Sequence, residues 1–159
     1  DLVSTIKAAL KAASLDASRL ELEITESLLL ENSQSNIDVL LAVRRLGVRV
    51  AMDDFGTGYS SLSYLRAFPF DKIKIDRSFM ADVATKADSR AILGAMISLG
   101  RNLGMTTVAE GVETAEQLAV VRAEGCTQVQ GYFFSPPIEG EAMLAMLQAE
   151  QCNRVRQRA

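Results

Sequence analysis

The stretch VAMDDFGTGYSSL, from Val50 to Leu62, places an apolar run directly before two adjacent carboxylates and a glycine-rich turn. The apolar residues predict a buried strand, and Asp53 and Asp54 fall where that strand should end. Adjacent carboxylates repel each other, and burying them is costly unless a cation or hydrogen-bond donors compensate. The simpler alternative is a solvated strand exit, in which Asp, Gly and Ser only form the turn. The rest of the chain must decide between the two.

The composition predicts one globular domain with a sizeable core, since 48% of the 159 residues are hydrophobic and 23% are charged. A net charge of −3 argues against nucleic acid or an anionic membrane as a bulk partner, whereas a small anion held through metals stays compatible. Cys126 and Cys152 lack metal-type spacing, so we expect reduced thiols. No apolar stretch is long enough to span a bilayer. We expect a cytoplasmic chain. If it belongs to a longer protein, a region upstream of it could anchor that protein to a membrane.

The sequence contains no histidine. This excludes Ser-His-Asp and Cys-His nucleophiles and any metal site built on imidazole. Acid, base and ligand roles must therefore fall to Asp, Glu, Lys, Asn and Gln. The chain also begins at Asp1, without a methionine, and enters a helical pattern at once, so we expect a piece of a longer protein.

Helical and strand patterns alternate along the chain. Alternating apolar residues predict five strands, in 19–25, 48–54, 71–76, 106–112 and 127–131. Helices are predicted over about 2–14, from Ser33 or Ser35 to near Gly47, over 60–67, about 88–104, 114–125, with Thr114 and Gln117 as a capping box, and 140 to about 152. This order predicts a parallel α/β sheet. It fits either a complete open sheet of five strands or a barrel that lacks part of its eight. We assign 1–152 to the domain and 153–159 to a polar tail.

Polar groups follow the predicted strands at their carboxyl ends. They are Glu23 and Glu26, Asp53 and Asp54, Asp76, Glu110 and Glu113, and Gln128 and Gln130. In parallel α/β folds these ends lie on one face, so the groups should converge there. Carboxylates without histidine or clustered cysteine suit Mg²⁺ or Mn²⁺. Two such ions are the usual arrangement for clamping a phosphodiester during in-line displacement.

Lysines accompany the acids on the third predicted strand. In KIKID, Lys72, Lys74 and Asp76 share the face opposite Ile73 and Ile75. Lys74 could stabilise charge on a phosphoryl group or orient the attacking water, and the alternative for both lysines is an ion pair inside a barrel. The glycines of Gly56-Thr57-Gly58 lack the spacing of a dinucleotide fingerprint and favour a sharp loop beside the site.

Four longer motifs stand out along the chain: ELEITES from Glu21, MDDFGTGYSSLSYLRAFPFDKIKIDRSF from Met52, VAEGVET from Val108 and QGYFFSPP from Gln130. They closely resemble those of EAL domains, the bacterial phosphodiesterases specific for cyclic di-GMP. The resemblance implies a TIM-barrel-like fold of which about five βα units are present. It also implies metal-dependent hydrolysis of cyclic di-GMP to pGpG with two Mg²⁺ or Mn²⁺ ions, with Ca²⁺ as an inhibitor. The implied partners are a second copy in a homodimer and upstream sensory or GGDEF-type domains.

The resemblance also implies roles for individual residues. Glu23, Asp53 and Asp54 resemble metal ligands, with Asp53 shared between two ions. Lys74 resembles the lysine that positions the water, Glu110 a catalytic or metal-associated glutamate, and Gln130 a residue near the second metal. Glu26 resembles the glutamate that holds the loop after Asp54, while Asp76 and Glu113 look like supporting or substrate-side acids. The loop linked to dimerisation comprises Phe55, Gly56, Thr57, Gly58, Tyr59, Ser60 and Ser61.

The departure from the family lies at the front of the chain. The Glu-Ala-Leu signature, a phosphate-contacting arginine and an asparagine ligand belong to early strands that are not in these residues. We therefore expect weak or no activity from this chain alone. A non-catalytic receptor for cyclic di-GMP or a protein-interaction module is the alternative, although such members usually have eroded metal motifs. Without the family, carboxylates and a Lys-x-Lys also fit an enolase-type barrel, against which the DDFGTGYSSL loop argues.

Overall fold

The computed structural model describes residues 1–26, 28, 33–58, 65 and 68–156. Its described strands form one five-stranded parallel sheet in the order β1-β2-β3-β4-β5, which confirms the predicted parallel α/β class. The strands are β1 (Glu21–Thr25), β2 (Arg49–Phe55), β3 (Lys72–Ile75), β4 (Thr106–Ala109) and β5 (Gln128–Val129).

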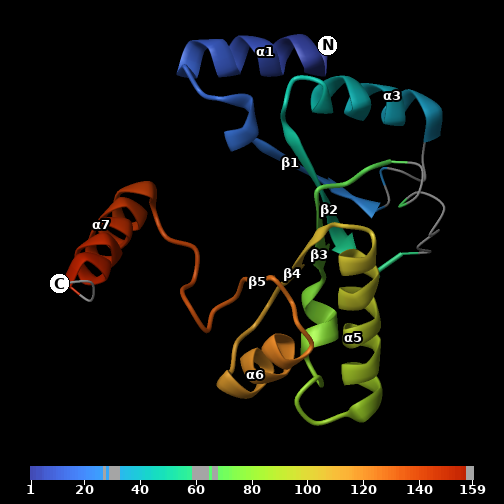
Figure 1. The fold of residues 1–159 in the computed structure, drawn as a ribbon, viewed down its shortest axis with the longest axis vertical. Helices are drawn as coiled ribbons and strands as arrows, with labels where there is room; N and C mark the ends of the chain where they lie inside the picture. The colour runs from blue at the N-terminus through green and yellow to red at the C-terminus, as the bar shows by residue number, and fades with distance from the viewer. Residues whose placement is uncertain (27, 29–32, 59–64, 66–67, 157–159) are drawn as a thin grey trace.

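Helices connect and flank the strands (Figure 1). They are α1 (Leu2–Ala13), α3 (Ser33–Arg44), α5 (Ala87–Asn102), α6 (Ala115–Ala123) and α7 (Gly140–Arg156), with short 3-10 helices η1 (Ala17–Arg19) and η2 (Arg77–Met80). In Figure 1, α5 lies along the strands, whereas α7 stands apart on the other side. Among helices of the described residues, none combines the length and apolar character that crossing a membrane requires.

Several predicted boundaries shift in the structure. The fifth strand shortens from 127–131 to Gln128–Val129, the fourth ends at Ala109 instead of reaching residue 112, and the last helix continues to Arg156 beyond its predicted end near residue 152. The predicted capping box is confirmed, because the Thr114 side chain accepts from the Gln117 amide and the Gln117 side chain accepts from the Thr114 amide. The helix predicted over 60–67 lies almost wholly outside the described residues.

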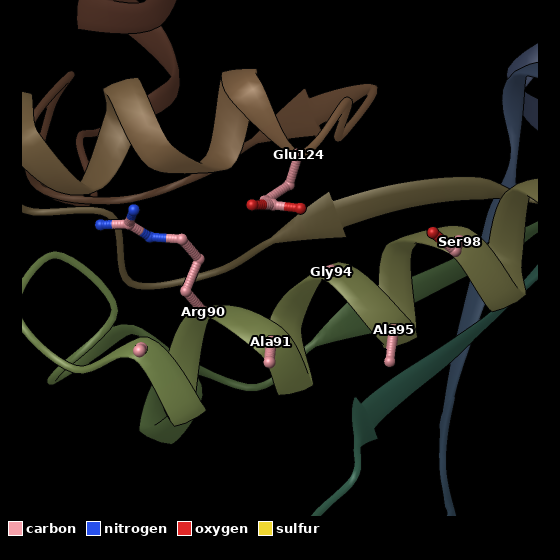
Figure 2. Close-up of a pocket in the computed structure, with 7 residues that line it drawn as sticks. Arg90, Ala91, Gly94, Ala95, Ser98 and Glu124 are labelled. Carbon is pink, nitrogen blue, oxygen red and sulfur yellow. The ribbon is translucent and has the colours of Figure 1, made fainter.

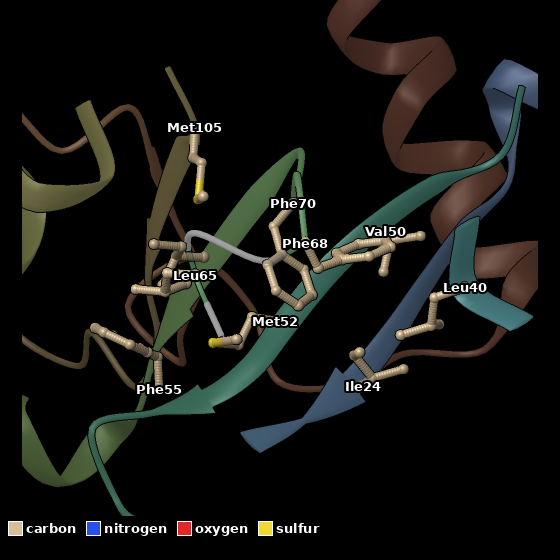
Figure 3. Close-up of a cluster of buried hydrophobic side chains, with 10 residues drawn as sticks. Ile24, Leu40, Val50, Met52, Phe55, Leu65, Phe68, Phe70 and Met105 are labelled. Carbon is tan, nitrogen blue, oxygen red and sulfur yellow. The ribbon is translucent and has the colours of Figure 1, made fainter. Parts of the chain in front are cut away.

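One face of the sheet is apolar and packs against the helices. Ile73 and Ile75 of β3 are fully buried there, as is Val50 of β2. Around them lies a cluster that joins strands β1 to β3 to α3 and the segment before β3 (Figure 3), made up of Ile24, Leu40, Val50, Met52, Phe55, Leu65, Phe68, Phe70, Ile73 and Met105. Burying this face holds the strands in register, so the opposite face is left to charged side chains.

Candidate metal centre

Alternate residues of β1, β2 and β3 carry charges on the other face of the sheet. Glu21 lies beside Lys72, with 2.7 Å between the carboxylate Oε1 and the ammonium Nζ, and Arg49 lies 3.8 Å from the same glutamate. One step nearer the carboxyl ends of the strands, Glu23 pairs with Lys74. The prediction that Lys72 and Lys74 share a face opposite two isoleucines is confirmed, since the lysines pair with Glu21 and Glu23 while both isoleucines pack in the apolar clusters. Asp76, predicted on the same face, follows β3 and caps η2.

Lys74 contacts three carboxylates on this face. Its Nζ lies 2.9 Å from Oε2 of Glu23, 3.0 Å from Oδ1 of Asp53 and 2.8 Å from Oε1 of Glu110. The side chain is 9% exposed. Burial would lower the pKa of Lys74, but its contacts with Glu110, Glu23 and Asp53 outweigh that effect and raise this pKa well above its ordinary value. The lysine is therefore charged at neutral pH and offsets the repulsion among three acids.

A β-bulge brings Asp53 and Asp54 to the same place. Met52 pairs with Ile73 and Phe55 with Ile75, so two residues of β2 lie opposite the single residue Lys74. Asp54 has a φ of 53°, in the left-handed region, and its amide donates to Oδ1 of Asp53 at 3.0 Å. A regular strand would send adjacent side chains to opposite faces, whereas the bulge re-aims one of them.

Asp53, Asp54 and Glu110 together form a group that fits a metal ion. Each offers a carboxylate oxygen, and these three atoms lie within 4.8 Å of one another. Glu110 comes from directly after β4, where its amide donates to the Ile75 carbonyl at 3.1 Å. Three hard oxygen donors match the preference of Mg²⁺ and Mn²⁺. The solvated-turn reading of the aspartate pair therefore does not account for its position.

Glu26 lies behind the bulge. It is 5% exposed, and its Oε2 accepts a hydrogen bond from the Gly56 amide at 3.3 Å. Its Oε1 is buried and has no hydrogen-bond partner within the described ranges. Thr57 closes the turn, because its amide and its hydroxyl both donate to the Asp54 carbonyl. Of the predicted loop, Phe55, Gly56, Thr57 and Gly58 are thus described, whereas Tyr59, Ser60 and Ser61 lie outside the described residues.

Three predicted site residues are not joined to the acidic group. Asp76 caps η2, where it accepts from the Ser78 amide at 3.0 Å, and hydrogen bonding by Ser78 lowers its pKa. Glu113 is exposed, and its amide is bonded to the Gln117 side chain. Gln130 follows β5, with its amide bonded to the Ala109 carbonyl, but its side chain is exposed.

Glu21 is a charged residue that the sequence reasoning did not single out. Its Oε2 is buried and makes no hydrogen bond among the described residues, and its other oxygen accepts a hydrogen bond from Lys72. The signal was available in the alternation of Glu21 and Glu23, which matches that of Lys72 and Lys74 on the same face of the sheet.

Cavities among the described residues lie beside other parts of the fold. One of about 430 Å³ opens between α5 and the end of α6 (Figure 2), and it is lined by Ala87, Arg90, Ala91, Gly94, Ala95, Ser98 and Glu124. No predicted site residue lines it. Another of about 270 Å³ is lined by Gln130 together with Val129, Gly131, Phe134, Ser135, Met143, Met146 and Leu147. Gln130 thus faces an apolar hollow beside α7.

Comparisons with known proteins identify a family and several similar proteins. A family model described as "EAL domain" matches residues 1–137. The chain is 46% identical over 148 residues to the cyclic di-GMP phosphodiesterase NbdA of Pseudomonas aeruginosa, which covers 93% of this chain and 19% of that protein. The first such relatives are matched over 18% of their own length, so the chain spans about a fifth of the curated proteins it resembles.

Solved structures agree. The PaMucR phosphodiesterase in complex with c-di-GMP superposes with a TM-score of 0.84 at 40% identity, over 89% of this chain and 57% of that one. The EAL domain of Mycobacterium smegmatis DcpA gives a TM-score of 0.87 at 38% identity, over 92% and 66%. A manganese and cyclic di-GMP complex of Klebsiella pneumoniae BlrP1 gives 0.81 at 37% identity, over 85% and 34%. The sheet is therefore part of a TIM-barrel-like fold, as predicted.

Proposed function

Because this chain belongs to the EAL domain family, we propose that it forms one wall of a divalent-cation-dependent site that hydrolyses cyclic di-GMP to linear pGpG. The carboxylate group of Asp53, Asp54 and Glu110 beside Lys74 is the observation that carries the proposal. The chain spans 57% of the PaMucR structure, so the proposed turnover belongs to the intact domain. Alone, we expect the 159 residues to be weakly active or inactive.

Asp53, Asp54 and Glu110 are the proposed cation ligands, with Glu23 as a fourth candidate. Glu23 is 47% exposed and reaches the group through Lys74, so it has room to turn toward a cation. Mg²⁺ or Mn²⁺ is the proposed cofactor, supported by the all-oxygen donors and by the manganese complex of BlrP1. Two such ions, when bound, would neutralise the phosphodiester and activate the attacking water.

Lys74 is proposed to hold the ligands in place as well as to act on water. An ammonium group has three N–H donors, and Glu23, Asp53 and Glu110 lie within reach of all three. Orienting a water would require one of these bonds to open. The exposed Glu23 contact is the one that we expect to open first, because solvent competes best there.

The remaining predicted residues take supporting roles in the proposal. Glu26 would hold the turn after Asp54 through the Gly56 amide, and Gln130, which follows β5 next to Glu110, would lie near the second cation. Asp76 would act only through η2, which it caps, and Glu113 from the rim. We further propose that the protein is a cytoplasmic homodimer whose two copies meet through the loop that begins at Phe55. Sensory or GGDEF-type domains are proposed to lie upstream of this chain.

Turnover of cyclic di-GMP by the intact protein tests the proposal. With Mn²⁺ or Mg²⁺ we expect pGpG as the product. We expect Asp53→Ala and Glu110→Ala to lower kcat by at least about a hundredfold, since a ligand is lost from the cation site. Asp82→Ala is the matched control, because among the described residues that carboxylate forms an ion pair with Lys86 alone, on the surface. Normal turnover by both ligand variants would overturn the assigned roles.

Calorimetry with the nucleotide separates the enzyme from the alternative receptor. An enzyme should bind cyclic di-GMP in Ca²⁺ without turnover and consume it in Mg²⁺. Tight binding under both ions with no product would favour a non-catalytic receptor. Protein that ignores cyclic di-GMP but racemises a carboxylic acid would instead revive the enolase-type reading.

A further inference from the structure

Gly56, in the turn that follows Asp53 and Asp54, has close neighbours on two sides. Its amide donates to Glu26 on one side. On the other, a Cβ atom placed on Gly56 would lie 2.6 Å from Cε of Met96 and 2.8 Å from the ring of Phe79, so a side chain there would force Met96 and Phe79 to shift. Gly56 also has a φ of 97°, a conformation that glycine adopts readily. The backbone of the turn thus rests directly on two apolar side chains.

These two side chains belong to separate elements. Phe79 lies in η2, after β3, and packs against the cluster around Ile75 and Leu93. Met96 lies in α5 and packs against that cluster as well as against the one around Met52 and Phe55. Met96 therefore packs between the cluster around Ile75 and Leu93 and the cluster around Met52 and Phe55, next to the turn at Gly56. Its position is set by both clusters.

The conformation of Asp54 depends on what surrounds the turn. A left-handed backbone is unfavourable for a residue with a side chain, although less so for Asp than for most, so neighbouring structure helps to hold it. Local bonds contribute, since the Asp54 amide donates to Asp53 and the Asp54 carbonyl accepts from Thr57. Both are in the turn itself, so they move with it. The contact of Gly56 with Phe79 and Met96 ties the turn to the rest of the fold.

We propose that Phe79 and Met96 are positioning residues that hold the Asp53-Asp54 bulge in its cation-binding form by supporting Gly56. The inference rests on the proposed function, and it adds to the three carboxylates two apolar residues that are not among the proposed cation ligands. Without this support, the bulge would relax toward a regular strand, and Asp54 would turn away from Asp53 and Glu110. Cation affinity would fall although every ligand is present.

Titration of the intact protein with Mn²⁺ tests the inference. We expect Met96→Ala to raise the Kd for Mn²⁺ about tenfold, as other residues that orient metal ligands do. At saturating Mn²⁺, kcat should recover, because the ligands themselves are unchanged. Ile92→Ala is the matched control, since Ile92 lies on the same helix and is 49% exposed. Met96→Leu keeps the apolar volume and should bind Mn²⁺ like the wild type.

Amide hydrogen exchange gives a readout that needs no metal. If the support holds the turn, Met96→Ala should speed exchange of the Gly56 amide roughly tenfold, while Ile92→Ala should not. A Met96→Ala protein that unfolds at lower temperature but keeps the wild-type Kd and the wild-type Gly56 exchange would show a merely structural role and overturn the inference. Phe79→Leu, a smaller change, serves if Met96→Ala fails to fold, with the same two outcomes.

The two proposals fail in different ways. Wild-type protein that binds no Mn²⁺ would overturn the proposed function, and with it the link from the turn to a cation. The exchange measurement would still decide whether Phe79 and Met96 hold the turn. Wild-type protein that binds Mn²⁺, together with a Met96→Ala variant that binds it equally well, would leave the function standing and overturn the positioning role.

Discussion

Strands β2 and β5 both lead into predicted site residues but differ in length and in pairing. β2 runs for seven residues, pairs with β1 on one side and β3 on the other, and buries Val50 and Ala51 completely. β5 has two residues, and in the described part of the chain it pairs with β4 alone. Asp53 and Asp54 are consequently held by neighbours on both sides, whereas Gln130 is held on one side through its backbone.

Apolar side chains differ in the same way. Those around β2 and β3 are enclosed, whereas those after β5 lie open to solvent to between 37% and 67%, namely Tyr132, Phe133, Phe134, Ile138, Met143, Leu144, Met146 and Leu147. Enclosed apolar surface stabilises the fold in proportion to its area, and exposed surface does not. The site is therefore rigid where the sheet is paired on both sides and loosely built where the sheet is open.

Truncating one apolar residue in each region should give the largest contrast. Ile73→Ala removes a fully buried side chain, so we expect a loss of about 3 to 4 kcal/mol in the free energy of unfolding. Leu144→Ala removes a side chain that is 57% exposed and should change it by less than about 0.5 kcal/mol. Urea unfolding measures the free energy of unfolding of both variants. Equal losses would show that the side chains after β5 are packed as tightly as those around β3.

Lys74→Met tests the charged face of the paired region. It leaves three carboxylates without their shared cation, and we expect the free energy of unfolding to fall by about 2 to 3 kcal/mol at neutral pH. Lys86→Met is the control, because Lys86 is 64% exposed and, in the described part of the chain, its ammonium pairs with Asp82 alone. Exposed pairs of this kind contribute under about 1 kcal/mol. Similar stability of the two variants would show that the contacts of Lys74 with the three carboxylates do not stabilise the fold.

Asp71, at the start of β3, should give a smaller and pH-dependent effect. Burial would raise its pKa, but hydrogen bonds from Arg44 and the Val50 amide, with the charges of Arg44 and Arg49, hold it below the ordinary value of 3.8. A lowered pKa adds stability above pH 3.8 that is lost as pH falls through the folded-state value. Asp71→Asn should cost about 1 to 2 kcal/mol at pH 7.

The pH dependence is the sharper part of that test. The gap between wild type and Asp71→Asn should narrow below about pH 4, as the wild-type carboxylate is protonated. Unfolding by urea at pH 7, 5 and 3 measures it. A gap that stays constant from pH 7 to pH 3 would mean that the Arg44 and Val50 bonds do not depend on the charge of Asp71.

Gln130→Ala should have the smallest effect. The Gln130 side chain is exposed, and the bonds of the residue to Ala109 and Val112 are made by its backbone. We expect the free energy of unfolding to change by less than about 0.5 kcal/mol. Because Gln130 is proposed to lie near the second cation without being a ligand, the Kd of the intact protein for Mn²⁺ should rise far less than in Asp53→Asn. A rise as large as that of Asp53→Asn would make Gln130 a cation ligand.

Local features of the fold were predictable from the sequence. The capping box of Thr114 and Gln117 needs only residues three apart, and the alternation in KIKID sends both isoleucines to one face and both lysines to the other whatever surrounds them. The end of β5 was less predictable, because a strand continues only as far as it finds a partner. TQVQG therefore yields two paired residues.

The candidate site divides along the same line. That acids and a lysine follow parallel strands could be predicted from the residues alone, since period-2 alternation and turn chemistry are properties of short segments. Which of these side chains meet depends on the packed sheet. The register of β1, β2 and β3 brings Lys74 to Glu23, 51 residues earlier in the chain, and the bulge opposite Lys74 turns Asp54 beside Asp53. Both depend on how distant strands pair, because hydrogen bonds between strands, and the burial of their apolar face, set the register that no single segment contains.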